Sequence, residues 1–194
     1  MTFEPYSTTD VPRASQPILA ATEKSLGFVP NLYRVMAESP AALSSYQAIG
    51  RAQQLSALTD IEQQVVAVTV RIANGCEYCV AAHSTLAKGL KIDSATLSAL
   101  RLNHPLPQQR LEALRQFTLS TLAHEGWTPD ASIQTFLDAG FKRQHIFDVI
   151  ALIAMKTLAN YVNHIADPAL DKAFADQAWH PPATGAPVAA TYHY

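Results

Sequence analysis

Apolar residues recur at helical spacing through most of the chain, and no stretch shows sustained alternation of apolar and polar residues. Proline and glycine fall between these apolar patterns, where they begin or end elements. The pattern predicts extended chain at residues 1–12, followed by helices at about 15–26, 40–55, 60–73, 76–88, 94–102, 108–124, 128–140 and 142–166. We therefore expect an all-α protein built from helical hairpins.

Capping signals set several of these boundaries. Gly27 is suited to end the first helix, and Ser39 followed by Pro40 is suited to begin the second. The run Thr59–Glu62 reads as a capping box, in which each side chain bonds to the backbone of the other. Asn74–Gly75 stops the strongly apolar helix at 60–73, and Gly89 is the expected terminator of the helix that follows.

We expect one all-helical domain at residues 1–180, with its chemical core at about 59–90, and an irregular C-terminal tail at 181–194. A faint internal echo relates Gln64–Val68 to Asp148–Leu152, 84 residues apart. At the same offset Cys76 and Cys79 correspond to Asn160 and Asn163. The echo indicates either an internal two-fold repeat or chance similarity between two buried helices.

Charge and hydropathy narrow the function classes. The net charge is −2 with no basic stripe, which argues against nucleic acid binding. No apolar run reaches the roughly 18 residues of a membrane span, and the N-terminus lacks the apolar region of a secretory signal. A cytoplasmic protein is therefore expected. Hydrophobic residues make up 48% of the chain and charged residues only 15%, which favours a homo-oligomer.

The two cysteines form a Cys-X-X-Cys pair, Cys76 and Cys79, with His83 four residues further on. On a helix these three residues share one face, and the cysteines are close enough to form a disulfide. In a reducing compartment such a pair is more often catalytic, redox-sensing or metal-binding than structural. The nearby helix N-terminus favours thiolate, and His83 can move a proton. We therefore expect a depressed pKa at Cys79.

Other readings of the motif stay open at this point. The cysteines could serve packing alone, with His83 a core histidine. A zinc site would need a fourth ligand. The further histidines have no paired spacing: His104, His124, His145 and His164. Several aromatic residues could either line a substrate channel or pack in the core, namely Tyr33, Tyr46, Tyr78, Phe147 and Tyr161. Tyr78 is singled out because it lies between the cysteines.

The run Asn74–His83, preceded by the valine-rich helix, resembles the core of the alkylhydroperoxidase D / carboxymuconolactone decarboxylase family, and most closely its peroxidase-related branch. Phe28–Leu32, Asp148–Ile150 and Asn160–His164 add to the likeness. The resemblance implies a bundle of helical hairpins that assembles into trimers or hexamers. It also implies thiol-dependent reduction of hydroperoxides, without metal, haem, flavin or other cofactor.

Carried over by position, the resemblance makes Cys79 the cysteine that attacks the peroxide, Cys76 the resolving cysteine and His83 the proton-relay histidine. The oxidised pair would then be reduced by a dithiol protein or small thiol. The family's relay glutamate corresponds here to Gln64, which can orient a histidine but cannot accept a proton at neutral pH. Gln64 and Tyr78 are therefore predicted as relay or orienting residues. Neither Glu62 nor Glu77 is a simple substitute for the missing carboxylate.

Two other functions compete with a peroxidase. The absence of the relay glutamate favours a non-enzymatic thiol redox sensor or an oligomeric binding protein. A carboxymuconolactone decarboxylase-like lyase is the other alternative, although the intact cysteine pair argues against it.

Overall fold

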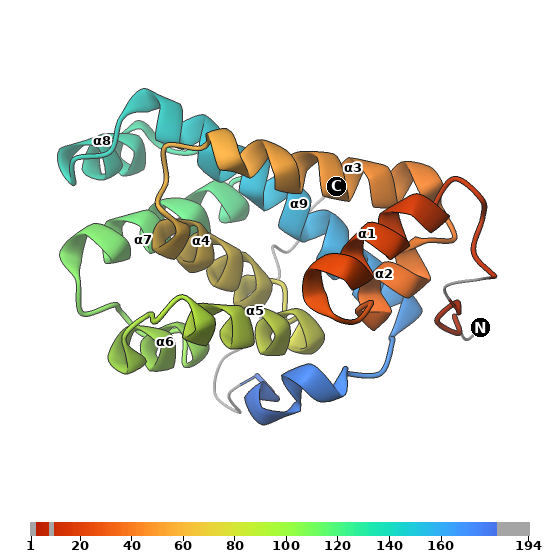
Figure 1. The fold of residues 1–194 in the computed structure, drawn as a ribbon. Helices are drawn as coiled ribbons and strands as arrows, with labels where there is room; N and C mark the ends of the chain where they lie inside the picture. Colours follow the sequence, from red (N-terminus) through yellow and green to blue (C-terminus); the bar gives the residue numbers. More distant parts are fainter. Residues whose placement is uncertain (1–2, 8–9, 182–194) are drawn as a thin grey trace.

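The computed structural model describes residues 3–7 and 10–181, and these residues form helices and connecting segments without a strand (Figure 1). The α-helices are α1 (Gln16–Leu26), α2 (Asn31–Met36), α3 (Pro40–Ala52), α4 (Asp60–Ala73), α5 (Glu77–Gly89), α6 (Ser94–Arg101), α7 (Gln109–Ala123), α8 (Asp130–Asp138) and α9 (Arg143–Ala166). Two 3-10 helices, η1 (Gln53–Leu55) and η2 (Lys172–Gln177), complete the list. The all-α prediction is confirmed. The predicted irregular tail lies, apart from residue 181, outside the described residues.

Helix α4 lies at the centre of the bundle and contacts α5, α6, α7 and α9 (Figure 1). Its valines make one apolar cluster with α7, α8 and the first half of α9. A second cluster joins α1, α2, α3 and α5 to the second half of α9, and it includes both cysteines. The predicted chemical core at 59–90 is therefore divided between the two clusters, and its cysteine pair lies in the second.

Most predicted boundaries agree with the structure, because local capping determines them. Helix α4 begins after the Thr59–Glu62 capping box and ends where predicted. The sequence pattern did not predict two short elements. These are α2, whose N-cap Pro30 provides no side-chain cap, and the 3-10 helix η2. The predicted terminator Gly89 is wrong, because it lies inside the last turn of α5 and Lys91 takes the left-handed conformation instead.

The internal echo does not correspond to a repeated structure. Residues 64–79 span two helices with a break at Gly75, whereas residues 148–163 lie within the single helix α9. The interpretation as an internal two-fold repeat of these segments is therefore wrong.

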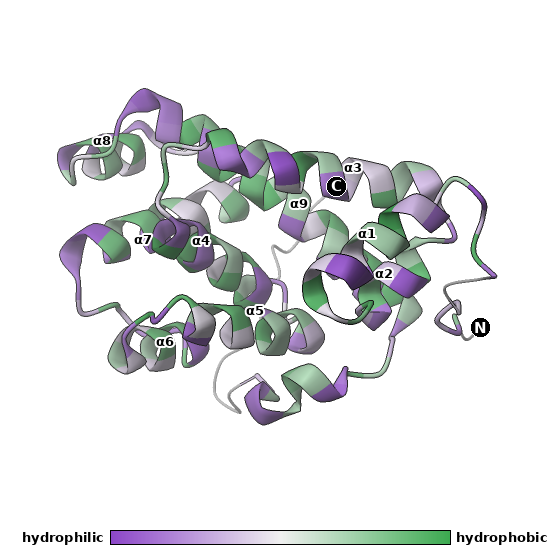
Figure 2. Cartoon of the chain, viewed as in Figure 1, coloured by the Kyte–Doolittle hydropathy of each residue, from purple (hydrophilic) through white to green (hydrophobic). Residues whose placement is uncertain are grey.

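Helix α9 is long and apolar enough to span a membrane, judged by length and composition alone. Figure 2 shows hydrophobic residues along much of its length. It packs against α2, α3, α4, α5 and α7, and its middle residues belong to both apolar clusters. Helix α9 thus contributes to both apolar clusters, and it also carries exposed apolar side chains: Phe147, Ile150, Tyr161 and Ile165.

Candidate functional site

The turn between α4 and α5 determines where the first cysteine lies. Gly75 has a left-handed backbone (φ +67°), and its N–H donates to the carbonyl of Ile72. The next N–H, that of Cys76, donates to the carbonyl of Arg71 over 2.9 Å. This pair of bonds is the Schellman pattern, which closes a helix with a glycine. It allows α5 to begin at once, with Cys76 as its N-cap residue.

Cys76 is buried, with 2% of its surface exposed, and lies beside the thiol of Cys79. Hydrogen bonding from that thiol is the main influence that lowers the pKa of Cys76, to about 6; burial opposes it and the side-chain amide of Asn160 assists it. The first proton lost by the pair therefore leaves the negative charge on Cys76, at the N-terminus of α5.

Cys79 is also buried, with 3% exposure, and the Nδ2 of Asn163 donates to its sulfur over 2.9 Å. Burial raises the pKa of Cys79 well above its usual value, and the neighbouring Cys76 raises it further. The expected depression of the Cys79 pKa is therefore wrong, because desolvation exceeds the effect of the helix terminus one turn away.

His83 and Gln64, on α5 and α4, are joined by a hydrogen bond of 2.8 Å between Nδ1 and Oε1. Because an amide oxygen only accepts, Nδ1 must carry the proton, which leaves Nε2 as a free acceptor. Burial, assisted by the positive charges of Arg71 and Lys156, holds the pKa of His83 well below its usual value. His83 is thus a neutral imidazole of defined tautomer, oriented by Gln64.

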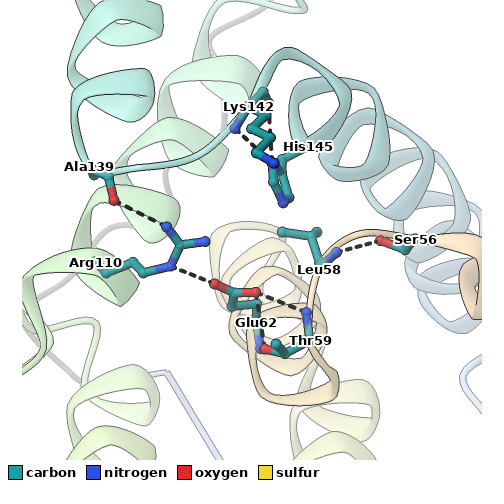
Figure 3. Close-up of polar contacts among 8 residues, drawn as sticks. All are labelled: Ser56, Leu58, Thr59, Glu62, Arg110, Ala139, Lys142 and His145. Atoms are coloured by element: carbon teal, nitrogen blue, oxygen red, sulfur yellow. Dashed lines mark hydrogen bonds and ion pairs between the residues drawn. The ribbon is translucent and has the colours of Figure 1, made fainter.

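Two glutamates near the motif do not replace the missing carboxylate. Glu62 receives the backbone N–H of Thr59 over 2.9 Å and an ion pair from the Nε of Arg110 over 2.9 Å (Figure 3). Both of its oxygens are therefore engaged at the start of α4, as the capping box predicts. Glu77 is exposed and pairs with His180.

Tyr78 is held by two bonds that tie α5 to its neighbours. Its hydroxyl donates to the carboxylate of Asp171 and accepts the backbone N–H of Leu32 over 3.2 Å. Asp171 also accepts the N–H of Asn31. The phenol thus connects α5 to the segment before η2 and to the start of α2. These contacts favour a structural role for Tyr78 over a role in a proton relay.

A cavity of about 340 Å³ opens beside Cys79 and His83, and Cys76 is not part of its wall. Tyr33, Tyr46 and Tyr78 line it, as the channel hypothesis expected, whereas Phe147 and Tyr161 lie exposed on α9. The apolar wall comes mainly from α2, the end of α1, α5 and η2: Leu26, Phe28, Pro30, Leu32, Ala82, Leu86, Ala173 and Phe174. The cavity offers one thiol and one imidazole to a bound molecule.

Four residues near the cysteines were missed by the sequence reasoning as site residues. Arg71 lines the cavity and places a positive charge next to Cys79, whereas Lys156 is buried nearby and burial holds its pKa well below the usual value. Each is a basic residue within an otherwise apolar helix, and this pattern could have identified both as candidate site residues from the sequence. Asn160 and Asn163 face Cys76 and Cys79, the residues they match in the 84-residue echo. The positions that correspond in the 84-residue sequence similarity are therefore in contact where α5 packs on α9.

No group of three histidine, cysteine or acidic residues suited to a metal ion occurs among residues 3–7 and 10–181. Two of the histidines considered as ligands have local partners. His124 contacts the carbonyl of Ser120, and His145 accepts the N–H of Lys142 over 2.7 Å, beside the Glu62 network (Figure 3).

Residues 36–104 match the sequence model of the carboxymuconolactone decarboxylase family, a segment that contains the cysteine pair, His83, Gln64 and Arg71. No curated protein sequence matches the chain.

Solved structures share the fold over nearly the whole chain. An alkylhydroperoxidase D core structure, an uncharacterised peroxidase-related protein from Ralstonia eutropha, is 21% identical with a TM-score of 0.78, covering 90% of this chain and 95% of its own. A peroxidase-related protein from a Silicibacter species is 22% identical with a TM-score of 0.74, covering 87% and 90%.

A third structure, of a cysteine-to-alanine variant of the debrominase Bmp8 in complex with 2,3,4-tribromopyrrole, is 16% identical with a TM-score of 0.75, covering 91% and 95%. These likenesses establish the fold. Over residues 36–104 the chain is also similar to the sequence model of the carboxymuconolactone decarboxylase family.

Proposed function

We propose that the protein is a thiol-dependent, peroxidase-like oxidoreductase that reduces hydroperoxides through a dithiol/disulfide cycle of Cys76 and Cys79. One observation carries the proposal: Cys79 lies in the wall of a mainly apolar cavity that His83 also lines, and Cys79 hydrogen-bonds to Cys76, which is outside the cavity. A substrate in the cavity meets one sulfur, and the second sulfur is within reach of the first.

In the first step, the Nε2 of neutral His83 accepts the proton of the Cys79 thiol. The Cys79 sulfur then attacks the terminal oxygen of the hydroperoxide, and the O–O bond breaks. The products are a sulfenic acid on Cys79 and an alkoxide, which takes the proton back from His83 and leaves as the alcohol. The guanidinium of Arg71, which lines the cavity, stabilises the negative charge that moves onto the leaving oxygen.

In the second step, the Cys76 thiolate attacks the sulfur of the Cys79 sulfenic acid. A disulfide forms and the hydroxyl group leaves as water after protonation. The low pKa of Cys76 suits this role, because the resolving thiol is ionised at neutral pH. An external dithiol protein or small thiol then reduces the disulfide by exchange and restores the pair.

We further propose a homo-oligomer, a trimer or hexamer, in the cytoplasm, with residues 1–180 as a single domain. Exposed apolar side chains on α9 support an interface between subunits: Phe147, Ile150, Tyr161 and Ile165.

The test is steady-state consumption of cumene hydroperoxide with dithiothreitol as reductant. The wild-type protein should turn over, Cys79→Ser should be inactive, and Cys76→Ser should stop after one equivalent. His83→Ala should lose activity by about 10²-fold, the range of general acid–base catalysis. A wild-type protein that is oxidised once but does not turn over with the reductant would instead be a redox sensor, which the replacement of the relay carboxylate by Gln64 favours.

A second reaction of the same dithiol is reductive removal of bromide from an aromatic ring, which the similarity to the debrominase favours. The ring would gain a proton, bromide would leave, and the cysteine pair would be oxidised to the disulfide. Release of bromide from 2,3,4-tribromopyrrole, measured with the same variants, separates this activity from peroxide reduction.

A further inference from the structure

Two buried basic side chains lie near the cysteine pair without an acidic partner: Arg71, and Lys156, whose pKa burial holds well below its usual value. Arg71 is 1% exposed and Lys156 is 6% exposed. The guanidinium of Arg71 donates from Nη1 to the carbonyl of Ala67 in its own helix, and its Nε has no hydrogen-bond partner. The ammonium of Lys156 contacts the sulfur of Met155 at 3.5 Å and the face of Tyr46 at 5.9 Å. Among the described residues, neither forms an ion pair.

Another arginine shows how this protein satisfies a buried guanidinium when its role is structural. Arg115 is 5% exposed, donates from Nε and Nη2 to the two carboxylate oxygens of Glu112 over 2.9 Å, and reaches Asn103 through Nη1. An unpaired buried charge costs far more than a paired one, so the contrast with Arg71 needs a reason. The side chain of Arg71 lines the cavity beside Cys79, where a bound molecule can provide the missing negative charge.

The groups around Arg71 do not provide that charge. The side chains whose charges or dipoles act on it and on Lys156 are Tyr33, Tyr46, Cys79 and His83. None of these is a carboxylate. Tyr33 and Tyr46 pack edge to face at 5.6 Å, both rings line the cavity, and most of its other lining residues are apolar. The cavity therefore combines a cationic end at the thiol with an aromatic and aliphatic body.

We propose that this cavity binds an organic anion, with its carboxylate or phenolate against Arg71 and its apolar body between Tyr33, Phe28 and Phe174. In naming this anion as part of the substrate, the inference rests on the proposed function: the preferred hydroperoxide carries an acidic group on an aromatic or branched apolar frame. Lys156 does not line the cavity, and burial favours its neutral form.

Binding is tested on the reduced wild-type protein with redox-inert probes. Benzoate, measured by calorimetry, is compared with neutral benzamide, and 4-nitrophenolate, measured by its absorbance, is compared with nitrobenzene. Each anion should bind about tenfold or more tightly than its neutral partner, and binding should lower the apparent pKa of 4-nitrophenol. Preference for benzoate identifies a carboxylate ligand, and preference for 4-nitrophenolate identifies a phenolate.

Arg71→Met should abolish the preference for anions, and it should raise the denaturant midpoint because an unpaired buried charge is removed. Arg71→Lys, which keeps a positive charge at this position, should retain part of the preference for anions, and this variant keeps the test available if Arg71→Met does not fold. Arg51→Met, an exposed arginine of α3 outside this cavity, is the control and should bind as the wild type does. If Arg71 served only a structural role, Arg71→Met would instead be less stable than the wild type and would keep the preference for anions.

The substrate class is tested with cumene hydroperoxide against its para-carboxylate derivative. The wild-type kcat/KM should be about tenfold higher for the carboxylate, and Arg71→Met should show no difference. If neither anion binds better than its neutral analogue, the anion site is wrong, whatever the peroxidase assay gives. If the anions bind through Arg71 but no hydroperoxide is consumed, the proposed function is wrong and the anion site stands.

Discussion

The Nδ1 of His83 lies 2.8 Å from the Oε1 of Gln64, so an amide holds the imidazole in one tautomer where the family resemblance leads one to expect a carboxylate. The amide fixes the ring but adds no charge, and burial keeps the ring neutral. The proposed proton acceptor is therefore a single histidine, positioned through its other nitrogen.

The change Gln64→Glu should speed the attack on peroxide. A carboxylate at this position favours the imidazolium, so the pKa of His83 rises toward neutrality and Nε2 becomes a stronger base. We expect an increase in kcat/KM of about tenfold, measured as initial peroxide consumption across pH. Gln64→Leu, which keeps the size but removes the acceptor, should lower it. An unchanged rate in both variants would mean that Gln64 serves only packing.

The bond from Asn163 to the Cys79 sulfur should stabilise the thiolate at the moment of attack. Asn163→Leu removes the donor and retains the volume, so the pKa of Cys79 should rise by about one further unit. The measurement is the pH dependence of iodoacetamide alkylation in the Cys76→Ser background, where Cys79 is the remaining thiol. Equal alkylation profiles with and without Asn163 would show that the contact has no electrostatic effect.

Several features of the site follow from local sequence and could be predicted. The spacing of Cys76, Cys79 and His83 determines a shared helix face, because helical geometry is local. The Thr59–Glu62 box fixes the start of α4 for the same reason, and it correctly removed Glu62 as a relay residue.

Other features depend on packing between distant segments and could not be predicted. Asn163 reaches Cys79 only because α9 packs on α5, and the surroundings of Arg71 depend on how residues of α2, α3 and α5 meet around the cavity. The division of charge between the cysteines depends on which sulfur is more deeply desolvated. The spacing of Cys76 and Cys79 in the sequence does not indicate which of the two sulfurs is more deeply buried.

The hydroxyl of Tyr78 should matter for stability and little for catalysis. Tyr78→Phe leaves the carboxylate of Asp171 and the N–H of Leu32 without this partner. We expect a loss of about 1–3 kcal/mol in the free energy of unfolding, measured with denaturant, and a change in kcat of less than about threefold. A large loss of kcat with unchanged stability would restore Tyr78 as a relay residue.

The low pKa of Cys76 should make stability depend on pH. Between about pH 6, the folded value, and 9.0, the ordinary value, the unfolded chain holds a proton that the folded protein has lost. The free energy of unfolding therefore increases with pH between about 6 and 9.0, by up to about 1.4 kcal/mol per pH unit. This contribution of Cys76 is lost as pH falls through about 6. Denaturation of the reduced protein at several pH values should show this slope in the wild type. Cys76→Ser should lose it, and an equal slope in both proteins would contradict the assignment.

The central claim is that Cys79 attacks a hydroperoxide and Cys76 resolves the product. It is tested most directly by intact-protein mass spectrometry after one equivalent of cumene hydroperoxide is added to the reduced protein. The account predicts a loss of two hydrogens in the wild type, from a Cys76–Cys79 disulfide. It predicts the gain of one oxygen on Cys79 in Cys76→Ser and no change in Cys79→Ser. An oxidised Cys76 in Cys79→Ser at the wild-type rate, or a wild-type protein with both thiols intact, would contradict it.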